Sequence, residues 1–312
     1  MKSKMSKVAV VILNYNSKDD LFKCIGDIQK QKEVDIVTIV VDNASNTGIV
    51  KAVQEWSNEN YPSSISGTPQ EIIDIVSKEK KIGSLLFIYN NENRGYSAGN
   101  NIGIQVADKL DVDAVLIANP DMQFPDEKYV SKLAEVMMFK DEYFIVASKI
   151  IGLDGKDQSP LRESTFWEEL LWPLQLLPKK LFNPRSYILP YEPNTIMEVP
   201  KVMGCSLLLR MSFLREIGYL DEKVFLYSEE PILSAQVKRL NGKIMFVPYV
   251  EAIHAHITSE KGNSSLRMLS FIKSRRYYID TYSTYNFLQK VVLKTSYLLL
   301  SLLHKLKSKG KY

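Results

Sequence analysis

Short apolar runs rich in Val and Ile alternate with helical patterns through the first half of the chain, and this alternation constrains the fold more than any other feature. Between the runs, apolar residues recur at i, i+3, i+4 and i+7, which is typical of amphipathic helices. Because the runs do not alternate with polar residues, both faces of the sheet should be covered. The pattern predicts an α/β fold with a mainly parallel central sheet. We expect its strands at Val8–Leu13, Ile36–Val41, Ser84–Tyr89 and Ala114–Ala118.

Composition sets bounds on the class of protein. The 312 residues are 45 % hydrophobic and 24 % charged, which favours a globular chain over a disordered one. No apolar run approaches the roughly 18 residues that a transmembrane helix needs. The apolar patch Val8–Leu13 is too short for a secretory signal, so we expect a cytoplasmic protein. Cys24 and Cys205 cannot form a disulfide framework and are expected to be buried thiols.

The patterns divide the chain into three parts. Residues 1–124 carry the regular strand and helix alternation, residues 125–260 a looser one, and residues 261–312 a basic helical extension. Within the first part, the segment 57–83 interrupts the rhythm with a polar stretch rich in Pro, Gly and Ser, 61–70, and a short amphipathic stretch, 71–78, and we interpret it as a surface insertion.

Polar side chains follow each of the four predicted strands. Ligands bind outside the carboxyl ends of the strands in an open α/β sheet, so these residues are candidates for one site. Turn formation is the alternative, because Asn and Asp are also common in turns. Their coincidence at one sheet edge favours a ligand site. The segments are Asn14 to Asn16, Asp42 and Asn43, Asn90 to Arg94, and Asn119 to Asp121.

Five sequence blocks, in this order, resemble the inverting family 2 glycosyltransferases, which have the GT-A fold. The resemblance implies a nucleotide-diphospho-sugar transferase whose halves, 1–124 and 125–260, bind the nucleotide sugar and the acceptor. The Asn-Arg-Gly-Tyr block with Asn-Pro-Asp is similar to the rhamnosyltransferase-like branch, which builds bacterial surface polysaccharides such as capsule or O-antigen. The blocks are VVILNYNS (10–17), IVVDNAS (39–45), NENRGYSAGNNIG (91–103), LIANPD (116–121) and MGCSLLLRMSFLREIGYLDEKVFLYSEE (203–230).

A pyrimidine nucleotide sugar is the expected donor. The Asp42 carboxylate, at the end of the second strand, can accept the N3 proton of uracil or thymine, which favours a UDP- or dTDP-sugar, dTDP-rhamnose included. Arg94 can reach a diphosphate, although an ordinary surface ion pair is the alternative. By the resemblance, the residues that bind the nucleotide sugar are Asn14, Tyr15, Asp42, Asn43, Arg94, Gly95 and Asn119.

A divalent cation, Mg²⁺ or Mn²⁺, is expected to neutralise the departing diphosphate. The resemblance assigns it to Asp121, although this chain has Asn119-Pro120-Asp121 where the family has Asp-Xaa-Asp. His254 or His256 would supply a second ligand; the two lie on one face of a strand, and His254 has the better spacing to Ser259. Two structural imidazoles are the alternative. A dedicated zinc site is not expected, because no further Cys or His accompanies them.

The acceptor hydroxyl must lose a proton to a base. Glu229 and Glu230 match the family's Glu-Asp motif, with Glu230 as the base and Glu229 as its support. The alternative is the general preference for acids at a helix N-terminus. Asp221 resembles a family residue that contacts the acceptor or donor sugar.

The extension is strongly basic. Residues 261–312 hold eleven Lys or Arg and one acid, a charge of +10, so residues 1–260 carry −6 of the total +4. The body shows no basic stripe, so we expect no nucleic-acid partner. Residues 286–309 predict a basic amphipathic helix, which could bind the anionic inner face of the cell membrane near a lipid-linked saccharide acceptor. An ordinary docking helix or a homodimer helix is the alternative.

We therefore expect an inverting, metal-dependent glycosyltransferase. One alternative is a catalytically inactive GT-A-like protein that binds a nucleotide or a partner, because the metal motif lacks one carboxylate. A nucleotidyltransferase is less consistent with the sequence, which has no Gly-rich loop with Arg near the N-terminus.

Overall fold

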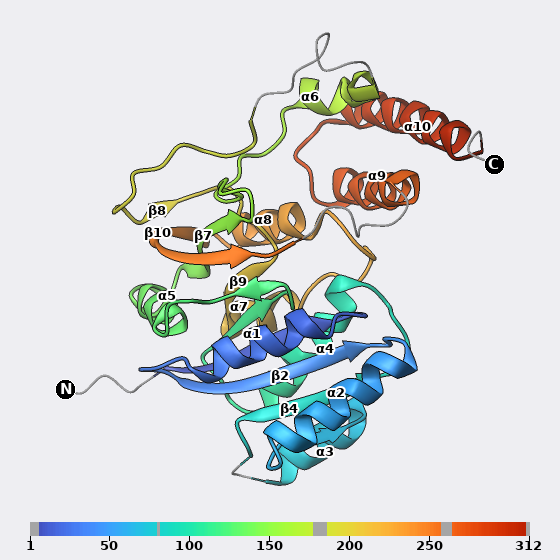
Figure 1. Cartoon of the computed structure of the whole chain (residues 1–312). Coiled ribbons are helices and arrows are strands. Elements are labelled where there is room, and N and C mark those ends of the chain that lie inside the picture. The colour runs from blue at the N-terminus through green and yellow to red at the C-terminus, as the bar shows by residue number, and fades with distance from the viewer. Residues whose placement is uncertain (1–5, 80–81, 177–185, 257–263, 310–312) are drawn as a thin grey trace.

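A computed structural model describes residues 6–79, 82–176, 186–256 and 264–309 of the chain. Its strands form one sheet in the order β3-β4-β2-β1-β5-β9-β7-β10-β6, with β8 paired to β10 (Figure 1). They are β1 (Lys7–Asn14), β2 (Asp35–Asn43), β3 (Ile65–Gly67), β4 (Leu85–Asn90), β5 (Ala114–Ala118), β6 (Met122–Gln123), β7 (Tyr143–Gly152), β8 (Met197–Glu198), β9 (Ser206–Arg210) and β10 (Lys243–His254).

Helices cover both faces of this sheet. The expected helix after the first strand is confirmed as α1, and its residues Leu21, Cys24, Ile25 and Ile28 are buried. The helices are α1 (Asp19–Gln29), α2 (Thr47–Asn60), α3 (Pro69–Lys78), α4 (Tyr96–Lys109), α5 (Tyr129–Met138), α6 (Phe166–Leu170), the 3₁₀ helix η1 (Trp172–Leu176), α7 (Met211–Ile217), α8 (Glu229–Arg239), α9 (Ser264–Thr281) and α10 (Phe287–Lys309).

Two hydrophobic clusters lie on opposite faces of the sheet. Side chains of α1, α2 and α5 form one cluster, and those of α3, α4, α7 and α8 form the other. Strands β1, β2 and β5 are buried along nearly their whole length, since each contributes to both clusters. The predicted mixed α/β architecture is confirmed. The sheet is parallel through β3-β4-β2-β1-β5, whereas β9 runs antiparallel to both of its neighbours, β5 and β7.

The segment 57–83 differs from the expected surface insertion. It contains β3, which extends the sheet by pairing with β4, and α3, which buries Ile72 and Val76. A capping box between Thr68 and Glu71, with Pro69 at the first helical position, fixes the start of α3. The polar composition reflects these turns and an edge strand.

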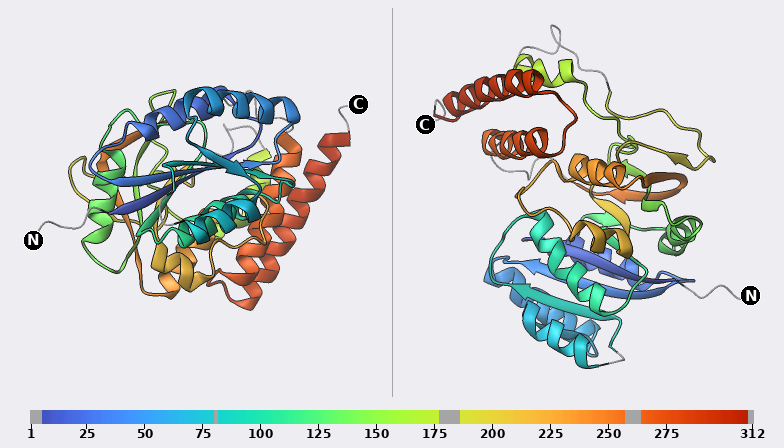
Figure 2. Two further views of the ribbon diagram at one scale, coloured as in Figure 1. Left: turned by 90° about the horizontal axis from the view of Figure 1, so that it is seen from below. Right: turned by 180° about the vertical axis from the view of Figure 1, so that it is seen from behind.

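The C-terminal helices α9 and α10 lie beside each other at the end of the molecule remote from α3 (Figures 1 and 2). They form a third hydrophobic cluster with α6 and η1, in which Ile279, Leu293 and Tyr297 are buried. Within the described ranges, no helix combines the length and the apolarity that a membrane span requires.

Candidate active site

A cleft of about 650 Å³ lies beyond the carboxyl ends of the first strands. Six of the predicted site residues reach it from β1, β2, the loop after β4, the turn after β5 and the end of β10. The loop before α8 supplies an apolar wall through Phe225 and Leu226. The predicted residues that line the cleft are Tyr15, Asn43, Gly95, Asn119, Asp121 and His256.

Asn14 and Asp42 are neighbours in register at the ends of β1 and β2. The Asn14 side-chain amide donates a 3.0 Å hydrogen bond to Asp42 Oδ2, and the Ser45 amide donates to Asp42 Oδ1 at 2.9 Å. Asp42 is 3 % exposed and Asn14 is fully buried, whereas Tyr15 is 54 % exposed. Asp42 therefore lies behind the cleft wall, and Tyr15 is the residue of this group that reaches the cleft.

The loop after β4 packs tightly against the loop before α8. Gly95 has φ +101°, and a Cβ there would lie 2.2 Å from the carbonyl oxygen of Phe225, so only glycine fits. The next amide, that of Tyr96, donates to the same carbonyl at 2.8 Å. Asn43 fixes the loop from the other side, because its side-chain amide donates to the Gly95 carbonyl and to Asn93.

Arg94 lies away from the residues that line the cleft. Its guanidinium pairs with Glu222 at 3.0 Å, and the arginine side chain is 60 % exposed. Glu222 also accepts a hydrogen bond from Asn101 on α4. The surface ion pair that the sequence left open as an alternative is the arrangement observed.

Asp121, His254 and His256 converge at the end of β10. His256 Nδ1 lies 3.0 Å and His254 Nε2 lies 3.4 Å from Asp121 Oδ2. One ligand atom from each of the three residues lies within 4.8 Å of the others. Burial would raise the pKa of Asp121, but the hydrogen bonds and charges of the two imidazoles outweigh it and hold that pKa below its ordinary value.

The donor atoms of this cluster suit a divalent cation. Asp121 Oδ1 and His256 Nε2 are buried and have no hydrogen-bond partner among the described residues. Such atoms are costly unless something binds them. Gln158 Oε1 contacts His254 Nδ1 at 2.8 Å, which orients the ring with Nε2 toward Asp121. Both histidines thus face Asp121, and Ser259 lies outside the described residues.

The acid pair Glu229 and Glu230 begins α8, as predicted. The two residues before it, Tyr227 and Ser228, both have positive φ, 72° and 70°. Consecutive left-handed residues other than glycine are strained, and such strain occurs at functional sites. Glu229 is nearly buried; burial and then the charge of Glu230 raise its pKa well above the ordinary value. Glu229 Oε1 has no partner within the described parts of the chain.

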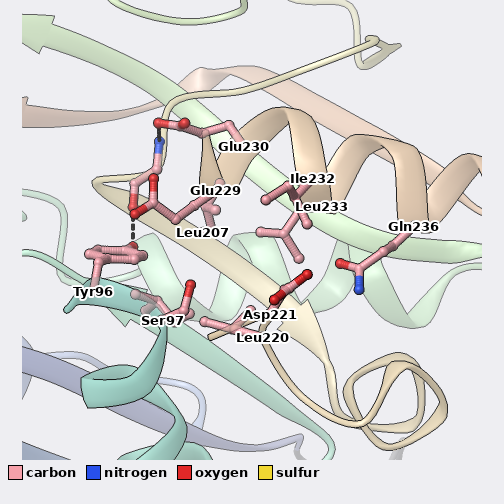
Figure 3. A pocket seen from close by; sticks show the side chains of 12 residues that line it. Tyr96, Ser97, Leu207, Leu220, Asp221, Glu229, Glu230, Ile232, Leu233 and Gln236 are labelled. Atoms are coloured by element: carbon pink, nitrogen blue, oxygen red, sulfur yellow. Dashed lines mark hydrogen bonds between the residues drawn. The ribbon is translucent and has the colours of Figure 1, made fainter. Parts of the chain in front are cut away.

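Tyr96 and the segment before β9 connect the acid pair to the cleft (Figure 3). The Tyr96 hydroxyl donates to the Gly204 carbonyl at 2.6 Å, and the Gly204 amide donates to Glu230 at 3.3 Å. The carbonyl of the following residue, Cys205, accepts from the Asn119 amide at 2.9 Å. Burial, and then the charges of Glu229 and Glu230, raise the pKa of Tyr96. Two adjacent residues thus bridge the turn that carries Asp121 and the start of α8.

Asp221 lies close to the acid pair around a small cavity but is already hydrogen bonded (Figure 3). The hydroxyls of Tyr277 and Tyr282 donate to its Oδ2 at 2.7 and 2.6 Å, and the Lys223 amide donates to Oδ1. Two of these partners come from the C-terminal part of the chain. Asp221 therefore joins that part to the loop before α8.

Three residues of the site were not predicted from the sequence: Tyr96, Gly204 and Phe225. Tyr96 lies inside the quoted Asn-Arg-Gly-Tyr block, which was a usable signal. Gly204 and Phe225 contribute backbone hydrogen bonds, which a pattern of side chains in the sequence does not predict.

Residues 9–217 match the family described as Glycosyl transferase family 2. The chain belongs to this glycosyltransferase family. The match includes Asp42 and Asp121 and ends before Glu229. The predicted glycosyltransferase family and activity are thereby confirmed.

The relatives of this glycosyltransferase agree with its fold. It is 25 % identical over 279 residues to the low-salt glycan biosynthesis hexosyltransferase Agl10 of Haloferax volcanii, covering 88 % of this chain and 73 % of that protein. Two solved structures share the fold at 13 % identity. One is GalNAc-T7 crystallised with UDP, GalNAc and Mn²⁺, with a TM-score of 0.60, and the match covers 100 % of this chain and 59 % of that one. The other is the mannosyltransferase PcManGT of Pyrobaculum calidifontis with GDP-Man and Mn²⁺, with a TM-score of 0.57, and the match covers 99 % of this chain and 77 % of that one.

Proposed function

We propose that this glycosyltransferase is an inverting, divalent-metal-dependent hexosyltransferase of glycan biosynthesis. The observation that carries the proposal is the group of unpartnered buried atoms, Asp121 Oδ1 and His256 Nε2, at the cleft. The solved neighbours crystallised with Mn²⁺ and a nucleotide or nucleotide sugar, and the curated relative is a hexosyltransferase, which supports the same reading.

The residues of the site divide the chemistry between them. Asp121, His254 and His256 would hold the cation, which neutralises charge on the departing diphosphate. Glu230 accepts the proton of the acceptor hydroxyl as its oxygen bonds the anomeric carbon, and the nucleoside diphosphate leaves with the electron pair. The raised pKa of Glu229 keeps it protonated beside Glu230, so one carboxylate of the pair stays available as the base.

The donor in this proposal is a UDP- or dTDP-sugar, dTDP-rhamnose included. Asp42 supports it through its chemistry, because a carboxylate at the end of β2 can accept the N3 proton of uracil or thymine. Since Asp42 lies behind the cleft wall, it would have to turn toward the cleft to make this contact. Each Asp42 oxygen holds one hydrogen bond and retains a second lone pair.

The acceptor in this proposal is a lipid-linked saccharide at the inner face of the cell membrane, in the assembly of a bacterial surface polysaccharide. The outer face of α10 supports membrane contact, since Leu288, Val292 and Leu299 are exposed along it beside a strongly basic segment. In this proposal the enzyme is cytoplasmic and is bound peripherally to anionic lipid.

A donor screen tests the proposal. The full chain is mixed with UDP-, dTDP- and GDP-sugars, with and without Mn²⁺ or Mg²⁺, and thermal stabilisation and donor hydrolysis are measured. We expect metal-dependent hydrolysis of a UDP- or dTDP-sugar. The Asp121→Ala variant should lose the hydrolysis, and Asp141→Asn, which alters an exposed carboxylate that pairs with Arg210 and does not line the cleft, should keep it. Donor binding without any turnover would instead identify an inactive nucleotide-binding protein.

A further inference from the structure

A second pocket, of about 170 Å³, is lined in part by Glu230 and shares no lining residue with the cleft. The small cavity of Figure 3 shares Glu230 with this pocket and Tyr96 with the cleft. This volume is many times the roughly 10 to 15 Å³ that one water needs, so the pocket can hold a ligand larger than water. The residues that line it are Leu161, Ser164, Trp172, Tyr187, Lys201, Ser228, Glu230, Pro231, Phe271 and Arg275.

The pocket combines aromatic walls with unpartnered hydroxyls. Trp172, Tyr187 and Phe271 supply ring faces and edges, on which the C–H groups of a sugar can pack. Ser228 is 5 % exposed, and its Oγ has no hydrogen-bond partner in the described ranges. The hydroxyl of Tyr187 is also buried and has no hydrogen-bond partner among the described residues. A ligand rich in hydroxyl groups would satisfy both oxygens.

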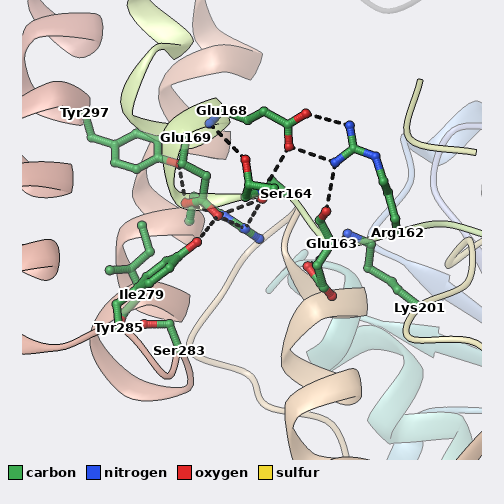
Figure 4. A network of polar contacts seen from close by, with 12 residues as sticks. Arg162, Glu163, Ser164, Glu168, Glu169, Lys201, Ile279, Ser283, Tyr285 and Tyr297 are labelled. Carbon is green, nitrogen blue, oxygen red and sulfur yellow. Dashed lines mark hydrogen bonds and ion pairs between the residues drawn. The ribbon is translucent and has the colours of Figure 1, made fainter. Parts of the chain in front are cut away.

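The two cations that line the pocket, Lys201 and Arg275, each pair with an acid of the protein; Figure 4 shows Lys201 beside Glu163. Lys201 pairs with Glu163 at 3.2 Å. Arg275 pairs with the buried carboxylate of Glu169 and donates to Ser164 Oγ at 2.8 Å. Because each positive charge has an acid beside it, the pocket carries little excess charge for a phosphate. A neutral ligand fits this balance better than an anion.

Two walls of the pocket come from the C-terminal extension, since Phe271 and Arg275 lie on α9. A larger groove of about 680 Å³ shares Ser164, Pro231 and Arg275 with the pocket. Tyr278, Tyr282 and Tyr285 line that groove. The groove gives the remainder of a saccharide chain a path away from Glu230.

We propose that this pocket binds the terminal sugar of the acceptor, that this sugar is a neutral hexose, and that Tyr187 and Ser228 recognise its hydroxyls. The inference deepens the proposed function and rests on it for the role of Glu230. In this arrangement the residues of α9 select the acceptor and the cleft binds the donor, and the acceptor hydroxyl meets the anomeric carbon beside Glu230, which would take its proton.

The test measures binding and donor hydrolysis in the same samples. The full chain with UDP and Mn²⁺ is titrated with methyl glycosides of glucose, galactose, mannose, rhamnose and N-acetylglucosamine, with methyl glucuronide and glycerol phosphate as anionic counterparts. Saturation-transfer NMR and calorimetry report binding. We expect at least one neutral glycoside to bind, and Tyr187→Phe and Ser228→Ala each to weaken it about 3- to 10-fold. Tyr249→Phe, an exposed tyrosine outside the pocket, is the matched control and should change nothing.

The outcomes separate the two proposals. The inference fails if no neutral glycoside binds, if the anionic ligands bind better, or if neither Tyr187→Phe nor Ser228→Ala changes binding. Each of these results counts against it even when the donor is hydrolysed. If every donor resists hydrolysis while a neutral glycoside binds with the expected sensitivity, the proposed function fails and the saccharide pocket stands. Phe271→Leu gives an independent check, because it removes part of the aromatic wall and should weaken glycoside binding; unchanged binding in this variant would contradict the inference.

Discussion

The hydroxyl of Tyr96 donates a 2.6 Å hydrogen bond to the carbonyl of Gly204, and the amide of that glycine holds Glu230. Tyr96 is therefore a positioning residue for the proposed base. The Tyr96→Phe variant should lose about 1 to 3 kcal/mol of stability, because a buried carbonyl loses its partner. We expect kcat to fall while the KM for the donor is unchanged, measured beside Tyr249→Phe as control. A destabilised variant with full kcat would restrict Tyr96 to a role in folding.

Metal binding should depend on the Asp121 cluster. Mn²⁺ at about 100 times its Kd would stabilise the folded chain by about 2.7 kcal/mol, since a ligand that binds only the folded state adds free energy of unfolding. Thermal melts should show this stabilisation for the wild type and for Asp141→Asn. Asp121→Ala and His256→Ala should melt at the same temperature with and without the ion. Equal Mn²⁺ stabilisation in all four proteins would place the metal elsewhere.

Glu230 is the proposed base, and its amide analogue tests that role. Glu230→Gln should lower turnover by about 10²- to 10⁴-fold and leave donor affinity intact, because general base catalysis contributes about that much. Single-turnover kinetics and donor titration measure the two effects. If Glu230→Gln keeps the full rate, Glu229 or Asp221 becomes the candidate base.

Glu229 should make stability depend on pH. Its pKa in the folded chain lies above the ordinary value of 4.5, mainly through burial, so the folded state holds its proton more tightly than the unfolded state does. This contribution is fully present below about pH 4.5 and is lost as the pH rises through the folded-state pKa. Urea titrations should show a decline in wild-type stability over that range and a smaller decline in Glu229→Gln. Parallel curves for the two proteins would contradict the burial argument.

Membrane contact through α10 can be tested without disturbing its packed face. Leu293, Tyr297 and Leu300 are buried against α9 and α6, so a deletion of the helix would expose this cluster. The double substitution Leu288→Glu and Leu299→Glu changes only the exposed face of α10, because both leucines are exposed. Flotation with anionic liposomes should decrease several-fold for this double variant. Phe139→Glu, an exposed residue of α5, is the control and should float like the wild type.

The sequence predicted the first strands and helices well, because their buried positions repeat with a clear local period. It did not predict that β9 lies antiparallel between β5 and β7, since strand order depends on contacts between distant segments. On α10, the neighbours Leu299 and Leu300 differ in burial, since Leu299 is 51 % exposed and Leu300 is 3 % exposed. The positions of α9, α6 and η1 against α10 decide which of its leucines are covered.

The candidate site shows the same division. The family resemblance assigned Asp121 as the metal ligand with His254 or His256 as the second, and the structure brings all three together. Arg94 has equally suitable chemistry but pairs with Glu222, 128 residues away. The sequence pattern gave no sign of that partner. Local sequence patterns can predict the type of residue at a site, but they cannot predict partners that are distant in the sequence.

The buried pair of Glu169 and Arg275 joins residues 106 positions apart. Ribosomes make the chain from its N-terminus, so Glu169 emerges well before Arg275 has been synthesised. Until then its carboxylate has no guanidinium beside it and cannot be buried at low cost. The half of the chain proposed to bind the donor can therefore fold early during translation, while the groove and the pocket proposed for the acceptor form only when the last helices dock.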